Sequence, residues 1–245
     1  MTDHLDIMNI NGAHVPSATN KPRFPLTPVI VAALLCGGLT ALCGVSHSAL
    51  AVTFGGLLAI TIALPPLAVA SDRWLDAVLI TIASITAVIL VWLWLAISWP
   101  QWWACTLVLT AFSFAVAATT MLLARIGTHA VVSAAIVLVI ALAWLSWPVW
   151  LSPYLAGHQT LVNALVAGHP LLAVNGTLID EEIWTERPQM YGWTALNQDV
   201  SFSMPASVFW CVILHAGIGV ASVSPITIAL LRRRGMVQHR NSVKA

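Results

Sequence analysis

The sequence predicts an all-α fold, a polytopic membrane helix bundle with six transmembrane spans, and three observations support it. The chain of 245 residues is 59% hydrophobic and only 8% charged, whereas a soluble domain carries about 25% charged residues. Six apolar segments follow one another, each long enough to cross about 30 Å of hydrocarbon. When these segments are drawn as spans, nine of the ten Lys and Arg fall on one side.

This charge asymmetry orients the predicted bundle. Because Lys and Arg concentrate in cytoplasmic loops, we expect the basic side to be inside and both termini to be cytoplasmic (N-in and C-in). We expect a multi-pass protein of the plasma (inner) membrane. Arg187 lies outside, and the inner residues are Lys21, Arg23, Arg73, Arg125, Arg232, Arg233, Arg234, Arg240 and Lys244.

The predicted elements follow in order along the chain. Residues 1–27 hold several prolines, which oppose helix formation and predict a disordered cytoplasmic tail. A five-span membrane bundle covers 28–151, an extracytoplasmic loop or cap 152–205, the sixth span 206–231 and a basic cytoplasmic tail 232–245. The individual spans are predicted at 28–46, 49–70, 76–98, 103–124, 130–151 and 206–231.

The outer cap between spans five and six is predicted to contain a short helix. Residues 159–174 (QTLVNALVAGHPLLAV) are apolar but too short to span a bilayer. Gly168-His169-Pro170 interrupts them, so we expect an interfacial or re-entrant helix that is broken there. Residues 175–205 mix aromatic, Pro, Gly and acidic residues, including Asp180, Glu181 and Glu182, which predicts a folded cap.

Three spans carry stripes of small and polar residues at helical spacing, which places each stripe on one face. Small residues let membrane helices approach closely, so we expect the first, fourth and sixth spans to form the centre of the bundle. The alternative is a pathway or pocket lined by these faces. The stripes comprise Cys36, Thr40, Cys43 and His47, then Thr106, Thr110, Ser113, Ala117 and Thr120, then Ser207, Cys211, His215 and Ser222.

The charged residues exclude several function classes. No Asp, Glu, Lys or Arg lies deep within a predicted span, whereas ion-coupled transporters, proton pumps and voltage sensors use buried ionisable groups. A net charge of +1 disfavours a nucleic-acid partner. No arrangement of nucleophile and base is visible, so we expect a non-enzymatic protein. The sequence also lacks a Walker motif, so active transport would need a separate ATPase.

Two Cys-x-x-x-His pairs are candidate metal ligands. A spacing of four places both side chains of a pair on one helix face. Cys43 with His47 and Cys211 with His215 would together supply the two thiolates and two imidazoles of a tetrahedral zinc or copper site. The alternative is that the thiols fill space as small apolar groups.

The tryptophans gather on the outer side, whereas an ordinary aromatic belt populates both interfaces. They predict an aromatic platform for a flat or lipidic ligand. The alternative is that more of the protein lies on the outer side, so that more of its tryptophans fall there. The platform residues are Trp99, Trp102, Trp103, Trp144, Trp147 and Trp150.

Two topological resemblances follow from this layout. Six spans, a Trp-rich turn after the third, and the outer histidines His47, His158 and His169 loosely resemble haem-handling proteins of cytochrome c biogenesis, which implies haem ligation by these histidines. Six spans with cytoplasmic termini and a short helix at 159–174 resemble permease subunits of ABC-2-type exporters, which implies a soluble ATPase partner.

We therefore expect a non-catalytic, permease-like transport or export component that works with a partner ATPase on a hydrophobic or lipidic cargo. One alternative is an outer-face haem- or metal-handling membrane protein. The other is a membrane scaffold whose cap docks an extracytoplasmic partner, or a further membrane subunit.

Overall fold

The computed structural model describes residues 26–44, 49–70, 74–93, 98–126, 128–177, 200 and 202–242. Within these residues the chain is helical and forms no β-strand. The helices are α1 (Leu26–Gly44), α2 (Ala49–Val69), α3 (Trp74–Trp92), α4 (Trp99–Arg125), α5 (Ala130–Trp150), the 3-10 helix η1 (Ser152–Leu155), α6 (Gln159–Gly168), α7 (Pro170–Thr177) and α10 (Phe209–Ser242).

Each of the six predicted spans coincides with one of the long helices. Among the described residues, three stretches are long and apolar enough to cross a membrane: Ala51–Val69, Trp99–Arg125 and Ala130–Trp150. The apolar parts of the other three long helices are shorter, at Thr27–Leu42, Asp76–Val91 and Phe209–Pro225. The all-α fold is thus confirmed with three candidate spans, and crossing by α1, α3 and α10 stays a prediction.

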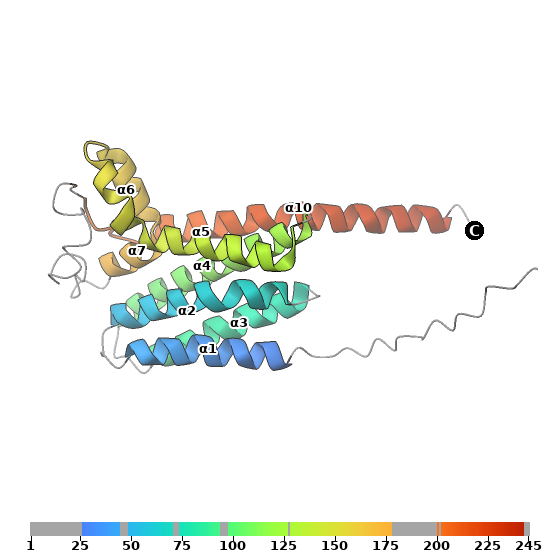
Figure 1. The fold of residues 1–245 in the computed structure, drawn as a ribbon, viewed down its shortest axis with the longest axis horizontal. Helices are drawn as coiled ribbons and strands as arrows, with labels where there is room; N and C mark the ends of the chain where they lie inside the picture. The colour runs from blue at the N-terminus through green and yellow to red at the C-terminus, as the bar shows by residue number, and fades with distance from the viewer. Residues whose placement is uncertain are drawn as a thin grey trace, which may run out of the picture.

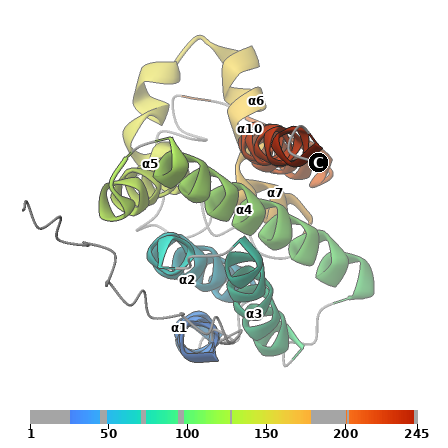
Figure 2. The same ribbon diagram turned by 90° about the vertical axis from the view of Figure 1, so that its right-hand side faces the viewer.

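The long helices run side by side, and the short ones gather at one end (Figure 1). The beginning of α1 and the far end of α10 lie at the end opposite to α6 and α7. Viewed along the bundle, α1 lies at one edge, α2 and α3 come next, and α4 crosses the middle (Figure 2). Helices α5 and α10 lie on either side of α4.

The centre of the bundle is formed by α2 and α4, which corrects the prediction that the first and sixth spans are central. Helix α2 packs against α1, α3, α4, α5 and α7, whereas α1 packs mainly against α2 and α3. Helix α10 packs mainly against α4 and α6. Cys36 and Thr40 are nevertheless buried, because two neighbouring helices are enough to cover a stripe of small side chains.

Helix α10 packs extensively against α4, and Gly219 and Ser222 of the sixth-span stripe region take part in this contact. A Cβ atom at Gly219 would lie 2.3 Å from Cδ1 of Phe114, so only glycine fits there. The hydroxyls of Thr119 and Ser222 lie 3.1 Å apart and share a hydrogen bond across the same interface. Close backbone approach and paired hydroxyls are typical of helix contacts within membranes.

The segment 159–174 folds as two short helices, with the break at the predicted place. Helix α6 ends at Gly168, His169 is extended, and Pro170 begins α7. A Cβ at Gly176 would lie 2.2 Å from the carbonyl oxygen of Pro205, so residues 202–208 pack closely against the end of α7. Residues 178–199, which hold Asp180, Glu181 and Glu182, and residue 201 lie outside the described residues; the folded cap stays a prediction.

Helix α10 does not end at residue 231 but continues to Ser242. Its 34 residues extend about 51 Å at 1.5 Å per residue, well beyond a hydrocarbon core of about 30 Å. Arg, Met and Gln are good helix formers, and an existing helix is extended without a new nucleation step. Part of the predicted basic tail is therefore helical, whereas residues 1–25 of the predicted N-terminal tail lie outside the described residues.

Candidate functional site

An apolar cavity of about 480 Å³ lies between α4, α5, α6 and α10. Helices α4, α5 and α10 contribute most of its lining, and α6 contributes Leu165. Figure 2 shows η1 and α6 bridging from the end of α5 toward α10. The lining residues are Phe112, Ala115, Val116, Thr119, Val137, Ile140, Ala141, Trp144, Leu165, Leu214, His215 and Ile218.

The cavity is closed toward the protein interior and open toward the side of the bundle. Among the lining residues Phe112 and Val137 are buried, whereas Ile140, Leu214 and Ile218 are 59%, 41% and 42% exposed and form its rim. In a membrane, exposed aliphatic groups on the flank of a bundle face lipid chains. The exposed rim thus lies on α5 and α10.

The close seating of α6 depends on Gly168. A Cβ at this position would lie 2.9 Å from Cδ2 of Leu214 and 3.7 Å from Cζ2 of Trp144. Because glycine has no side chain, the last turn of α6 rests directly on two lining residues. The sequence break that ends α6 thus also closes the cavity.

Three lining residues carry a polar group: Thr119, Trp144 and His215. The hydroxyl of Thr119 shares a hydrogen bond with Ser222. The Nδ1–H of His215 donates to the carbonyl oxygen of Cys211 at 2.8 Å, and within the described part of the chain no hydrogen bond reaches its Nε2 atom. The buried Nε1–H of Trp144 also has no hydrogen-bond partner among the described residues. The cavity wall thus combines an aliphatic surface with one unpaired acceptor and one unpaired donor.

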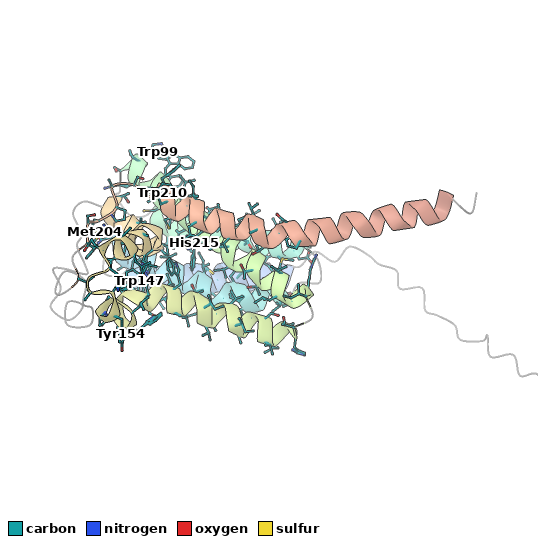
Figure 3. All side chains as sticks on the ribbon, turned by 90° about the horizontal axis from the view of Figure 1, so that it is seen from above. Trp99, Trp147, Tyr154, Met204, Trp210 and His215 are labelled. Carbon is teal, nitrogen blue, oxygen red and sulfur yellow. The ribbon has the colours of Figure 1, made fainter. Side chains whose placement is uncertain are left out.

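Aromatic and imidazole rings continue from the cavity into the short-helix end of the bundle. The ring of His215 lies 5.4 Å from that of Phe112 and 6.3 Å from that of Trp144. Trp144 in turn lies 5.9 Å from His169, which lies 6.0 Å from Trp147. In Figure 3, His215 and Trp147 lie in the interior near this end, between Trp99 at one edge and Tyr154 at the other.

His169 acts as a cap between α6 and α7. Its Nδ1 atom accepts a hydrogen bond from the backbone N–H of Leu172 at 3.2 Å, as an N-cap side chain does. Its Nε2–H then donates to the carbonyl oxygen of Leu145 at 3.2 Å. The ring is fully buried, and this burial lowers the pKa of His169 to about 3, so the imidazole is neutral with both nitrogens occupied.

The histidines predicted to hold haem are not brought together in the described residues. His158 is exposed at the start of α6, and His169 is buried at its end. They are about 15 Å apart along the helix axis at 1.5 Å per residue. His47 lies outside the described residues, so its role as a haem ligand stays a prediction.

Of the predicted Cys2His2 ligands, Cys211 and His215 lie next to each other, as a spacing of four on a helix requires. The Sγ of Cys211 lies 3.5 Å from Nδ1 of His215. His47 and the side chain of Cys43 lie outside the description, and α1 lies across the bundle from α10 (Figure 2). Among the described residues no group of three or more His, Cys, Asp or Glu is arranged to hold a metal ion.

The predicted tryptophan platform divides into separate groups. Trp99 and Trp102 stack with ring centres 5.0 Å apart, and Trp103 meets both edge-on. Trp144 and Trp147 instead surround His169, and their buried Nε1–H groups have no hydrogen-bond partner among the described residues. Trp150 is half exposed and donates to the carbonyl oxygen of Ala143 at 3.1 Å. Of the six, only Trp144 lines the cavity.

Sequence reasoning missed most of the lining because aliphatic side chains in a span serve equally well against lipid or against another helix. The available signal for the cavity was His215 in the stripe of the sixth span. It is the one histidine that lies deep within a predicted span. In comparisons with known proteins, no family model, no curated protein and no solved structure matches this chain.

Proposed function

We propose that this protein is a multi-pass membrane protein that holds a hydrophobic or lipidic cargo between α4, α5, α6 and α10. It would serve as the non-catalytic, permease-like component of a transport or export system. The observation that carries the proposal is the apolar cavity of about 480 Å³. Its volume is within the range of about 300–1,000 Å³ for small-molecule sites, and its rim is exposed on the flank of the bundle.

The proposed setting is the plasma (inner) membrane, with six crossings and both termini cytoplasmic. The positive-inside bias supports this orientation. The start of α1 and the end of α10 at the same end of the bundle agree with an even number of crossings (Figure 1). The cavity then lies toward the outer side, near α6.

A substitution that fills the cavity tests the cargo site. Ala141 is buried and lines the cavity, so Ala141→Phe would occupy its space. We expect the full chain in lipid nanodiscs to bind radiolabelled hexadecane saturably. Ala141→Phe should weaken this binding at least about tenfold, which corresponds to a loss of about 1.4 kcal/mol in binding free energy.

Ala130→Phe is the matched control, because Ala130 is exposed on the same helix outside the cavity lining. It should bind hexadecane as the natural chain does. Thermal melting of both variants reports on folding. Equal binding by Ala141→Phe and Ala130→Phe would contradict the cargo site.

The energy source is tested by identifying the proteins that co-purify with this chain. The chain has no Walker motif, so a soluble ATPase would have to supply energy for active transport. Extraction in mild detergent should recover a stoichiometric ATPase. Purification as a lone homo-oligomer whose cargo movement is independent of ATP would refute the permease role but not the cargo site.

A further inference from the structure

We infer that the cargo is a long-chain aliphatic alcohol, and that His215 recognises its hydroxyl. This inference rests on the proposed function, because it concerns the same cavity. The proposed function requires only that the ligand has an apolar chain. The inference also specifies the polar group of the ligand and the side chain that recognises it.

The first step is the protonation state of His215. A carbonyl oxygen only accepts hydrogen bonds, so the contact of 2.8 Å between Nδ1 and the Cys211 oxygen places the proton on Nδ1. No Asp or Glu lines the cavity, so a charged imidazolium would have no counter-charge in an apolar surrounding. The ring is therefore neutral, and Nε2 carries a lone pair.

The second step is the position of that lone pair. Nδ1 is turned toward the carbonyl of its own helix, so Nε2 is at the far side of a ring that lines the cavity. Phe112 meets the imidazole edge-on at 5.4 Å and Trp144 lies at 6.3 Å. These rings restrict the tilt of the imidazole. A ligand hydroxyl would supply a hydrogen-bond donor to this lone pair.

The third step is the exclusion of other headgroups. An alkane or an ester offers no donor to Nε2. An ionised carboxylate offers only lone pairs and brings an unpaired charge into an apolar site, which is strongly unfavourable. A phosphate or a quaternary amine would meet the same lack of counter-charges, since no charged residue lines the cavity. A neutral hydroxyl on an aliphatic chain satisfies both parts of the site.

Two other polar groups line the cavity. The hydroxyl of Thr119 shares a hydrogen bond with Ser222 and keeps a further lone pair, so its role is separated from that of His215 by the variants below. The Nε1–H of Trp144 has no partner among the described residues and can donate to the oxygen of an alcohol or of an ether alike. The role assigned to His215 is therefore to separate an alcohol from an ether of the same length.

The test uses the full chain in nanodiscs with radiolabelled hexadecanol as the probe. Unlabelled hexadecanol, hexadecane and hexadecyl methyl ether compete with it. The ether keeps the oxygen and the chain but lacks the O–H donor. We expect hexadecanol to compete about threefold to tenfold better than the ether, the range expected for one neutral hydrogen bond.

Two variants assign this preference to a residue. His215→Phe removes both ring nitrogens and keeps an aromatic ring, so it should bind alcohol and ether equally while still binding hexadecane. Thr119→Val removes the hydroxyl of the cavity lining and should keep the preference for alcohol. Retention of the preference in His215→Phe would overturn the role of His215.

The outcomes separate the two proposals. Saturable binding of alcohol, ether and alkane with equal affinity would overturn the alcohol assignment and leave the cargo site standing. Absence of saturable binding for all three compounds would overturn both. Stronger competition by palmitic acid than by hexadecanol would also overturn the assignment, because the site would then favour a carboxyl group.

Discussion

At the scale of single residues, the two buried histidines have different roles because their ring nitrogens have different partners. His169 uses both nitrogens within the protein, one toward Leu172 and one toward Leu145. His215 uses one nitrogen toward Cys211 and turns the rest of its ring to the cavity. The same residue type thus acts as a cap in one place and as a recognition group in the other.

The cap role of His169 predicts loss of stability in acid. Its pKa is lowered from 6.5 to about 3 by burial, so the unfolded chain binds a proton at a pH where the folded chain does not. The contribution of neutral His169 to the free energy of unfolding is fully present above pH 6.5. It is lost as pH falls toward 3, by about 1.4 kcal/mol per pH unit. The melting temperature in detergent should therefore fall between pH 7 and pH 4.5.

His169→Asn is the matched variant for this measurement. Asparagine is a good N-cap residue and does not titrate in this range, so the variant should lose distinctly less melting temperature over the same interval. An identical fall in both proteins would show that another group controls acid stability.

At the scale of elements, helices and loops make close contacts at glycines, which have no side chain. Gly219 admits Phe114 of α4, Gly168 admits Leu214 and Trp144, and Gly176 admits the backbone at Pro205. The contacts at Gly219 and Gly168 bring together helices that line the cavity. In a membrane, where lipid chains are as apolar as leucine, close backbone approach is a main source of association.

A pair of glycines in α10 tests this statement. Gly219→Ala would place a Cβ within 2.3 Å of Phe114, so we expect a loss of about 1–3 kcal/mol, the usual cost of overpacking. Gly217→Ala meets nothing within 4 Å and should be neutral or stabilising by up to about 1 kcal/mol. Thermal unfolding in detergent measures both, and equal effects would refute the close contact.

Helix positions were predictable from the sequence because hydrocarbon thickness fixes the length of an apolar run. The break at Gly168-His169-Pro170 was predictable too, since proline and glycine punctuate helices. The start of α4 was missed: it begins at Trp99, with Pro100 in a first turn where proline is tolerated. The side chain of Gln101 supports this turn, as it accepts a hydrogen bond from the Ser98 N–H and donates one to the Thr177 carbonyl oxygen.

The cavity was not predictable from the sequence, for a physical reason. Nearly every face of α4 and α5 is apolar, so periodicity does not distinguish a lipid-facing residue such as Val139 from a cavity-lining one such as Val137. Which helices become neighbours decides the lining, and α1 took an edge position that its stripe of small residues did not indicate. The capping role of His169 could have been anticipated, because a polar residue before a helix-starting proline is in the N-cap position.

At the scale of the whole molecule, the bundle has two unlike ends. One end holds η1, α6 and α7, and the other holds the start of α1 and the far end of α10 (Figure 1). Trp99, Trp147 and Trp210 lie toward the first end (Figure 3). The second end also carries the basic cluster at 232–234. This polarity predicts which end faces the cytoplasm.

Cysteine labelling tests the orientation. Tyr154 in η1 is 79% exposed, and Ile126 after α4 is 66% exposed; they lie at opposite ends of α5. We expect Tyr154→Cys to react with a membrane-impermeant maleimide in intact cells and Ile126→Cys to react only after permeabilisation. The natural chain is the control, because the described free cysteines Cys36, Cys105 and Cys211 are buried. The reverse pattern would invert the topology.

The central claim is that the space between α4, α5, α6 and α10 holds a hydrophobic cargo. Photo-crosslinking with a diazirine-bearing hexadecanol, followed by peptide mass spectrometry, tests it most directly. The account predicts labelling of lining residues such as Leu214 and Ile218 that unlabelled hexadecanol suppresses and Ala141→Phe abolishes. Labelling spread over outward-facing residues such as Leu34 of α1, without suppression by hexadecanol, would contradict it.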